Sequence, residues 1–376
     1  MKIVIVDAYY AAFLSHALRK IGSADLNYES MLSRLLALRF GTADFYSRHL
    51  RELGVEASDI VFNCEPLQRR WAEERGMAGG VGLRLQRGIA RLPLVRRWVG
   101  YPGLLTSIAV QQIRELRPDV LYLQDLSLFQ PSVLRSLRDA VGLIVGQIAS
   151  PLPEDDVVRP FDLILTSFPH YVDRFRAMGI RSEYFRIGFD PIVLDDLGPV
   201  QRHRPCTFVG GLSAAHARRT RFLEALARSV DIEFFGYGVE SLDSSSPIVP
   251  RHHGGAWALD MYRVLAESVI TVNVHIDVAE NYANNMRLYE ATGCGAMLVT
   301  DEKDNLSKLF VPGVEVIAYR DAAQAIERIH YYLDHRKEAA AIARAGQART
   351  LREHTYRQRM EELVRILNNY TRARAA

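Results

Sequence analysis

The chain has 376 residues, of which 48% are hydrophobic and 24% charged, so it is long enough for two or three domains with substantial cores. Its formal net charge of +3 is too small to indicate nucleic acid binding, and its three widely spaced cysteines form neither a disulfide framework nor a metal-ligand pattern. No apolar run is long enough to cross a bilayer and no signal peptide is recognisable, so we expect a cytoplasmic protein.

Short β-branched runs alternate with amphipathic stretches along the chain, which is typical of parallel α/β sheets. In the first half, strands are predicted at residues 2–6, 57–63, 120–124, 142–149 and 163–167. After a polar, proline-bearing stretch at 191–204, which we interpret as a linker, strands are predicted at 206–209, 232–235, 269–274, 297–300 and 314–319. The pattern predicts doubly wound domains at 1–190 and 205–350. A C-terminal helix at 351–376 ends a charged helical stretch with breaks near Gly346 and His354.

Residues 68–105 are predicted to form a basic helical insertion in the first domain. Between residues 68 and 100 there are eight arginines, no lysine and two acidic residues, and Arg84, Arg87 and Arg91 fall on one helical stripe. One interpretation is a solvated insertion with a basic face. The other is that residues 68–101 contact anionic lipid at the inner face of a membrane, or an anionic acceptor.

Residues 284–301, NNMRLYEATGCGAMLVTD, combine a polar helix start, a short helix, a glycine-rich turn and a buried strand. Asn284 or Asn285 can cap the helix, whose first unpaired backbone N–H groups suit a diphosphate. Arg287 adds donors for phosphate oxygens, and Glu290, on the same helix face, can accept hydrogen bonds from ribose hydroxyls. The alternative is an ordinary crossover helix in which Arg287 and Glu290 form a surface ion pair.

Three further predicted strands in the second half end in residues that suit a ligand site. These residues are Gly210 and Gly211, followed by His216 and Arg219; Gly236, Tyr237 and Gly238; and His275. Glycines allow a ring or sugar to approach closely, and Tyr237 could stack on a base. A glycine pair after a strand is also ordinary turn chemistry. However, the carboxyl ends of parallel strands meet at one edge of a sheet, where ligands bind.

The second half resembles the C-terminal domain of GT-B glycosyltransferases, in the group-1-like branch that includes the CgeB-type spore-maturation proteins. The matching segments are FVGGLSAAHARRTRFLEAL (208–226), FFGYG (234–238), NVH (273–275), the 284–301 motif and HTYRQRMEELV (354–364). The first half is more loosely similar, through DAYYAAFLSH, FGTADFYSRHLRELG, QDLSLF and GQIASPLP.

The resemblance implies two tandem Rossmann-like domains that face each other across a cleft, with the C-terminal helix crossing back to the first domain. It implies transfer of a hexose-like sugar from a nucleotide-diphosphate donor such as UDP-sugar to a glycan, lipid, protein or small-molecule acceptor, as in polysaccharide biosynthesis, without a metal or other cofactor. Glu290 would bind the donor ribose, and Arg287 with Arg219 would compensate the diphosphate charge. Tyr282 stands where retaining enzymes carry a second glutamate, so the stereochemistry stays open, as does the oligomeric state.

An inverting transferase needs a general base within reach of the acceptor hydroxyl. Asp125, just past the strand at 120–124, is the first choice by position, with Asp7, His16 and His170 as alternatives on other loops. Asp125 could instead cap the turn at 126–129, and His16 could be a surface helix residue. The remaining loop acids, at 154–156 and 301–302, are interpreted as solvated and not as metal ligands.

Three other protein classes are compatible with two α/β domains. A Rossmann dehydrogenase is disfavoured because no predicted strand is followed by G-x-G-x-x-G. A GT-B nucleotide-sugar epimerase would use the same donor pocket, and a product formed without an acceptor would favour it. A non-catalytic nucleotide- or sugar-binding protein would show no turnover.

Overall fold

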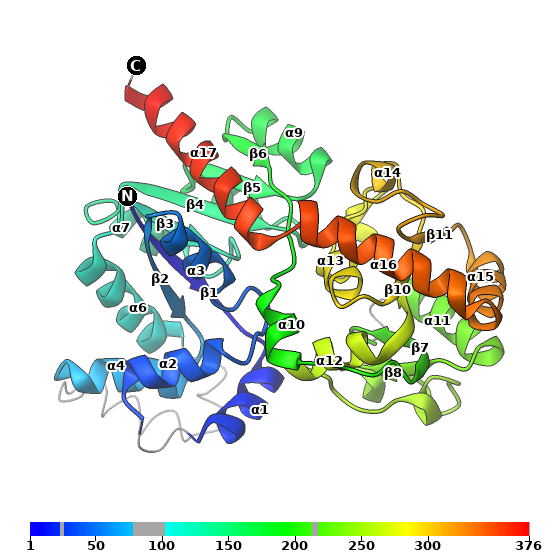
Figure 1. The fold of residues 1–376 in the computed structure, drawn as a ribbon. Coiled ribbons are helices and arrows are strands. Elements are labelled where there is room, and N and C mark those ends of the chain that lie inside the picture. Colours follow the sequence, from blue (N-terminus) through cyan, green and yellow to red (C-terminus); the bar gives the residue numbers. More distant parts are fainter. Residues whose placement is uncertain (23–25, 78–101, 213–216, 376) are drawn as a thin grey trace. The chain divides into compact units, whose positions relative to one another are not determined.

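The computed structural model describes residues 1–22, 26–77, 102–212 and 217–375 of the chain (Figure 1). Within it the chain divides into two compact units, Met1–Tyr184 and Phe185–Ala376. Each unit contains one parallel sheet covered by helices, which confirms the predicted α/β fold class.

Unit 1 is built on a six-stranded parallel sheet with the order β2-β1-β3-β4-β5-β6. Its strands are β1 (Lys2–Asp7), β2 (Glu56–Val61), β3 (Val120–Leu123), β4 (Leu143–Ile148), β5 (Leu163–Thr166) and β6 (Ser182–Tyr184). Each of the five predicted strands overlaps one of them. Every residue of β3, β4 and β5 is buried, as expected for parallel strands with both faces covered. The chain first moves from β1 to β2 at one edge and then returns to the other side of β1 at β3, so the strand order reverses between β1 and β3.

The helices of unit 1 are α1 (Ala11–Ile21), α2 (Tyr28–Leu36), α3 (Phe45–Glu52), α4 (Glu65–Glu74), α6 (Pro102–Leu116), α7 (Pro131–Ser136), α8 (Asp155–Val158) and α9 (Pro169–Ala177). The predicted basic insertion begins inside α4 and ends inside α6. Its central part, residues 78–101, lies outside the described residues, and so does the predicted stripe of Arg84, Arg87 and Arg91.

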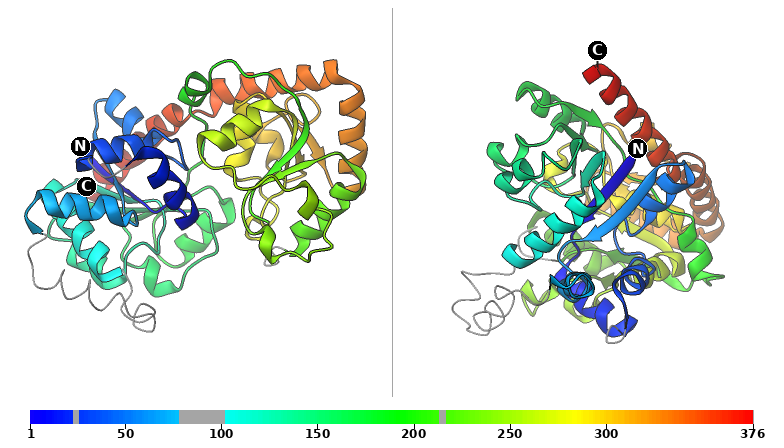
Figure 2. Two further views of the ribbon diagram at one scale, coloured as in Figure 1. Left: turned by 90° about the horizontal axis from the view of Figure 1, so that it is seen from below. Right: turned by 90° about the vertical axis from the view of Figure 1, so that its left-hand side faces the viewer.

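Unit 2 is built on a five-stranded parallel sheet with the order β11-β10-β9-β7-β8. Its strands are β7 (Arg204–Val209), β8 (Glu233–Phe235), β9 (Ser268–Asn273), β10 (Met297–Asp301) and β11 (Ile317–Tyr319). Its α-helices are α10 (Ile192–Leu197), α11 (Ala217–Ser229), α12 (Leu259–Glu267), α13 (Met286–Gly293), α14 (Leu306–Leu309), α15 (Ala322–Asp334), α16 (Arg336–Glu353) and α17 (Tyr356–Ala375). Here the strand order reverses between β7 and β9. Helices α12, α13 and α16 pack together, and α11 packs with α15; Figure 2 shows helices on both faces of this sheet.

Two sequence predictions about unit 2 were wrong in detail. The stretch at 191–204, predicted as a linker, contains helix α10. Helix α16 continues through Gly346, where a break was predicted, and extends past the predicted domain end at 350. A Cβ atom at Gly346 would lie 2.4 Å from the carbonyl oxygen of Glu315, so this glycine permits close packing of the helix and does not end it. The predicted break at His354 is confirmed, because α16 ends at Glu353 and α17 begins at Tyr356.

Candidate functional site

The start of α13 lies at the point where the strand order of the second sheet reverses. Asn285 is the N-cap residue, and its side-chain oxygen accepts a hydrogen bond from the backbone N of Leu288 at 3.2 Å. Its Nδ2 donates to Oδ1 of Asn273, the last residue of β9, at 2.7 Å, which ties the helix start to the sheet. The neighbouring Asn284 is buried, and within the described residues its Nδ2 has no hydrogen-bond partner. The helix start therefore offers backbone N–H groups and one unsatisfied amide to an anion.

Arg287 and Glu290 form a buried ion pair on α13, with Arg287 Nη1 2.8 Å from Glu290 Oε2. The two side chains are only 15% and 7% exposed, which excludes the surface ion pair that was the alternative interpretation. Arg287 Nε also donates to the carbonyl oxygen of Val209 at the end of β7, and the hydroxyl of Tyr262 donates to Glu290 Oε1 at a long 3.4 Å. Burial raises the pKa of Glu290, while Arg287 and Tyr262 oppose that rise.

The loops that follow β7 and β8 are joined through glycine. Gly236 has φ +138°, and a Cβ atom there would lie 1.9 Å from the carbonyl oxygen of Gly210, so only glycine fits. The backbone N of Gly210 donates to the carbonyl oxygen of Phe235 at 2.9 Å, and the N of Leu212 donates to that of Tyr237 at 2.7 Å. The two loops thus form one surface at the carboxyl end of the sheet.

An aromatic pair lies beside this surface. Tyr237 is 47% exposed, and its ring is stacked on that of Trp257, with centroids 5.6 Å apart and planes 9° from parallel. A Cβ atom at Gly211 would lie 3.0 Å from the Tyr237 ring, so the ring covers that glycine closely. Gly238, with φ +89°, follows the ring. Sequence reasoning identified Tyr237 but not Trp257, because nothing in the local sequence indicated that the two rings meet.

A cavity of about 400 Å³ lies at the carboxyl ends of β9, β10 and β11. We call it the His275 cavity, and it is lined by Arg218, Arg219, Phe222, Val274, His275, Ile276, Asp277, Glu280, Asp301, Lys303, Tyr319, Arg320 and Asp321. Arg219 donates from Nη2 to the carbonyl oxygen of Gly211 at 2.7 Å, and burial lowers its pKa. Predicted site residue His216 lies outside the described residues.

Asp301, interpreted from sequence as a solvated loop acid, is partly buried and contacts two side chains of this cavity, His275 and Lys303. Its Oδ1 lies 2.6 Å from His275 Nδ1, its Oδ2 lies 3.3 Å from Lys303 Nζ, and its side chain is 19% exposed. Burial alone would raise the pKa of Asp301, but the hydrogen bond and charge of His275 and the charge of Lys303 outweigh burial and lower it. The sequence signal was an acid at the end of a buried strand, which does not reveal its partners.

In unit 1, the structure brings two of the candidate bases together and keeps the others apart. Asp7 ends β1 and Asp125 follows β3, its paired neighbour, and the charge of Asp125 contributes to the raised pKa of Asp7. Burial is the main cause, and it raises the pKa of Asp7 to about 7. His16 lies on α1, and His170 lies at the start of α9, after β5, which β4 separates from β3.

Asp125 itself is exposed, and its Oδ1 accepts a hydrogen bond from the backbone N of Ser127 at 2.8 Å. This is the turn-capping role that was its alternative interpretation. Asp7, in contrast, accepts from the backbone N of Ala8 at 2.7 Å and has a pKa matched to proton transfer near neutral pH. Asp7 is the less exposed of the two acids, and burial raises its pKa towards neutral pH.

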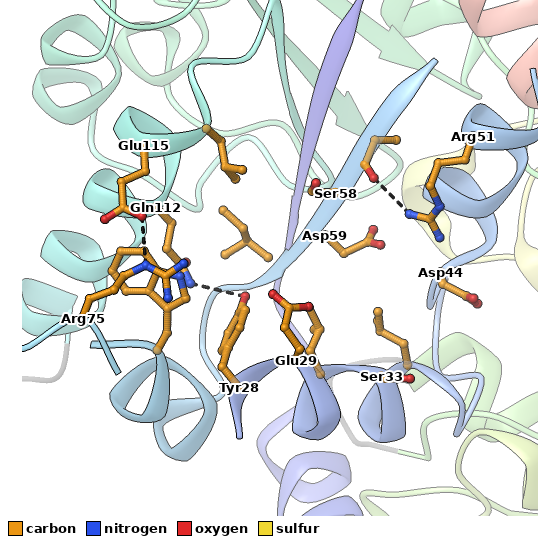
Figure 3. A pocket seen from close by; sticks show the side chains of 16 residues that line it. Tyr28, Glu29, Ser33, Asp44, Arg51, Ser58, Asp59, Arg75, Gln112 and Glu115 are labelled. Carbon is orange, nitrogen blue, oxygen red and sulfur yellow. Dashed lines mark hydrogen bonds and ion pairs between the residues drawn. The ribbon is translucent and has the colours of Figure 1, made fainter. Parts of the chain in front are cut away.

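A second cavity, of about 320 Å³, lies in unit 1 beside β2 (Figure 3). Its lining includes none of the predicted bases, and its charged groups are largely paired. Arg75 Nε lies 2.9 Å from Glu115 Oε2, and Gln112 donates to the Tyr28 hydroxyl at 3.3 Å, as Figure 3 shows. Burial raises the pKa of Asp59, on the wall formed by β2, to about 7.

Comparison with known proteins supplies the activity class. A family model described as glycosyl transferase-like matches residues 218–365, which include Arg219, His275 and the whole of α13. No curated protein sequence gives a significant match. HepE of Anabaena, solved in complex with UDP-glucose, is 13% identical with a TM-score of 0.60 and covers 98% of this chain and 100% of its own.

Two further solved structures have a similar fold. Sucrose-phosphate synthase of Thermosynechococcus elongatus is 10% identical, with a TM-score of 0.57, over 99% of this chain and 100% of its own. AviGT4, a glycosyltransferase involved in avilamycin A biosynthesis, is 15% identical, with a TM-score of 0.56, over 99% and 97%. At such identities the likeness shows the fold, and the family model adds the activity. Residues 218–365 therefore form a glycosyl transferase-like region within a chain that has the GT-B fold.

Neither a membrane-spanning helix nor a metal-binding cluster is found among the described residues. In that part of the chain, no helix is both long enough and apolar enough to span a bilayer. Over the same residues, no three His, Cys, Asp or Glu side chains come together as a group that could hold a metal ion. The three cysteines are all buried free thiols.

Proposed function

We propose that unit 2 binds a UDP-sugar and that the enzyme transfers its sugar to a hydroxyl group of a glycan, lipid, protein or small-molecule acceptor. The observation that carries the proposal is the buried Arg287–Glu290 pair at the capped start of α13, on the same sheet edge as the glycine loops. A buried carboxylate held beside a helix start fits a ribose next to a diphosphate. The complexes of HepE with UDP and UDP-glucose support the choice of nucleotide.

The site residues divide by chemistry into three groups. The start of α13, with Asn284 Nδ2 and Arg219, would bind the diphosphate, and Glu290 would accept hydrogen bonds from the ribose hydroxyls. The Tyr237–Trp257 pair offers a flat surface on which the base can stack. Arg287 is already engaged by Glu290 Oε2 and by the carbonyl oxygen of Val209, so its main role in this proposal is to hold the Glu290 carboxylate in place.

The reaction would join the acceptor oxygen to the anomeric carbon while the bond from that carbon to the diphosphate oxygen breaks. UDP leaves with a negative charge that the helix start and Arg219 stabilise. The proton of the acceptor hydroxyl would pass to a general base, for which we propose Asp7. We also propose that the enzyme belongs to the CgeB-type branch, that its turnover needs no metal, and that it acts at the cytoplasmic side of a membrane.

A thermal-shift screen tests the proposal directly. A ligand present at 100 times its Kd stabilises the folded state by about 2.7 kcal/mol, so UDP and UDP-sugars should raise the Tm by several degrees. We expect little effect from ATP or NADH. Release of UDP only when acceptor is added, unchanged by EDTA, is the expected turnover result. A product formed without acceptor would instead show an epimerase, and binding without any turnover a binding protein.

Glu290→Gln tests the assignment of the ribose site. Glutamine keeps the shape but loses the charged acceptor, and hydrogen bonds to charged groups contribute about 1.5–3 kcal/mol, so the Kd for UDP should rise about 10- to 100-fold. Alanine is a poorer choice, because it would leave Arg287 as an uncompensated buried charge. The exposed Glu327, on α15, provides the control variant Glu327→Gln. Unchanged UDP affinity in a folded Glu290→Gln protein would refute the site.

A further inference from the structure

The His275–Asp301 pair lies in the wall of the His275 cavity and has a defined proton arrangement. The His275 side chain is fully buried, and both its Nδ1 and its backbone N lie close to Asp301 Oδ1, at 2.6 and 3.1 Å. Because the Asp301 carboxylate is held ionised by its neighbours, the imidazole proton belongs on Nδ1. The opposite nitrogen, Nε2, is then the atom that is left to bond a ligand.

Two polar atoms in this wall, His275 Nε2 and Asp301 Oδ2, have unused hydrogen-bonding capacity. Among the described residues His275 Nε2 has no hydrogen-bond partner, although it is buried. In the described part of the chain, Asp301 Oδ2 has the 3.3 Å contact with Lys303 and no other, and the Asp301 side chain is 19% exposed. Buried polar groups are normally satisfied, so unsatisfied polar atoms beside a cavity indicate a polar ligand, and the Asp301 carboxylate requires one that brings donors. Hydroxyl groups are such donors.

The charges around the cavity favour an uncharged ligand. Lys303 and Asp301 neutralise each other, and Arg320 lies 3.0 Å from Glu302, on the rim. The cations Arg218 and Arg219 are balanced by Asp277, Glu280 and Asp321 in the same lining. A cavity of about 400 Å³ is within the range of small-molecule sites, which is about 300–1,000 Å³. A neutral polyol such as a hexose fits this balance better than an anion.

The cavity also adjoins the proposed donor site. Arg219 lines the cavity and donates to the Gly211 carbonyl oxygen in the glycine surface. His275 follows Asn273 by two residues, and Asn273 accepts the hydrogen bond from Asn285, the cap of α13. The region proposed for the diphosphate therefore leads into the His275 cavity along the same sheet edge.

We propose that the His275 cavity binds the sugar that is transferred, and that Asp301, positioned by His275, accepts a hydrogen bond from one of its hydroxyl groups. Asp301 then selects donors that carry a hydroxyl at that ring position. This inference rests on the proposed UDP-sugar function, and it concerns the sugar alone. The nucleotide is bound by other residues, so the two contributions separate in a binding experiment.

The test compares the Kd of UDP with the Kd of UDP-glucose by isothermal titration calorimetry, on the full chain and on two isosteric variants. Asp301→Asn removes the charged acceptor; we expect UDP-glucose to bind about 10-fold more weakly while the Kd of UDP changes less than about twofold. His275→Asn keeps a nitrogen that can donate to Asp301 but has no atom at the Nε2 position, and a smaller loss, about threefold, is expected. Asp334→Asn, at an exposed residue of α15, is the control.

UDP-glucose analogues that each lack one hydroxyl supply the second readout. In the wild-type protein one of them should bind about 10-fold more weakly than UDP-glucose, and in Asp301→Asn that difference should disappear, as in a double-mutant cycle. A merely structural role of Asp301 would not remove the difference.

Each other outcome overturns the inference in a recognisable way. If folded Asp301→Asn binds UDP-glucose as tightly as wild type, Asp301 does not contact the sugar. If UDP and UDP-glucose weaken equally, the cavity serves the diphosphate or the fold. If wild-type protein binds neither UDP nor UDP-glucose, UDP-galactose or GDP-mannose, the proposed function itself fails, and this inference fails with it.

Discussion

Burial raises the pKa of Glu290, Asp7 and Asp59, and their partners decide what each carboxyl group can do. Glu290 is next to a cation, so burial and Arg287 act on its pKa in opposite directions. Among the described residues, no cation contributes to the pKa of Asp7, and Arg51 lowers the pKa of Asp59 only in part. Burial therefore raises both pKa values to about 7. A buried acid without a close cation holds a proton near neutral pH, which suits a residue that must take up and release one.

Asp7→Asn should separate activity from stability. Asp7 has a pKa of about 7 when folded against 3.8 as its ordinary value, so ionising it costs folding free energy that grows as the pH rises from about 4 to 7. Asparagine avoids this cost. In urea unfolding, the increase in the free energy of unfolding over wild type should be about 2 kcal/mol larger at pH 8 than at pH 5. Turnover should fall about 100-fold or more.

The exposed Asp173, on α9, offers the matched control Asp173→Asn, which should change neither quantity. If Asp7→Asn retained full turnover, Asp7 would not be the base, and Asp125 would be the next residue to test.

Among the elements, the loops that follow the strands tolerate the least change in side-chain size and backbone conformation. The β7 and β8 loops approach so closely that Gly236 and Gly210 leave no room for a side chain between them. The start of α13 is equally specified, because the Asn285 cap is itself bonded to Asn273 of β9. Strands and helices bury the apolar residues, and these short connections place the polar groups.

Gly236→Ala should destabilise unit 2 and weaken UDP binding, because it adds both an unfavourable φ of +138° and a contact of 1.9 Å with the Gly210 carbonyl oxygen. Gly254→Ala is a matched control, with φ +91° but open space around the new Cβ. Backbone strain alone costs about 1–3 kcal/mol, so the control should lose about that much and Gly236→Ala clearly more. Thermal melting and UDP titration measure both; equal losses would show that the loop contact is not rigid.

At the scale of the whole molecule, each sheet places its candidate residues at the point where its strand order reverses. In unit 1 this point lies between β1 and β3, where Asp7 and Asp125 are found, and in unit 2 between β7 and β9, beside the start of α13. In unit 2, the residues between α16 and α17 contact the first residues of the unit: the backbone N of Phe189 donates to the carbonyl oxygen of His354 at 2.8 Å. The predicted crossing of α17 to the other domain stays a prediction.

His354 should make unit 2 sensitive to acid. Burial lowers its pKa to about 4, from 6.5 ordinarily, and its Nε2 lies 2.9 Å from the carbonyl oxygen of Leu309. As the pH falls from 7 to 4.5, His354 becomes protonated in the unfolded chain but stays largely neutral in the folded protein. The free energy of unfolding therefore falls by about 2 kcal/mol. His354→Gln, whose amide nitrogen can replace Nε2, should lose this part of the pH dependence in urea unfolding. The exposed His330→Gln should not.

Local patterns in the chain were enough to predict the alternating elements, the glycine-bearing strand ends, the break at His354 and a cap at the start of α13, because each depends on neighbouring residues. The expectation of a glycosyltransferase came from the resemblance of residues 208–364 to the GT-B family. Which acids are buried was decided by packing between distant segments. Asp301 was expected to be solvated and is bonded to His275, burial raises the pKa of Asp7 to about 7, and Gly346 lies inside a helix against Glu315. Burial and pairing arise from side chains far apart in sequence, so only the tertiary structure could assign them.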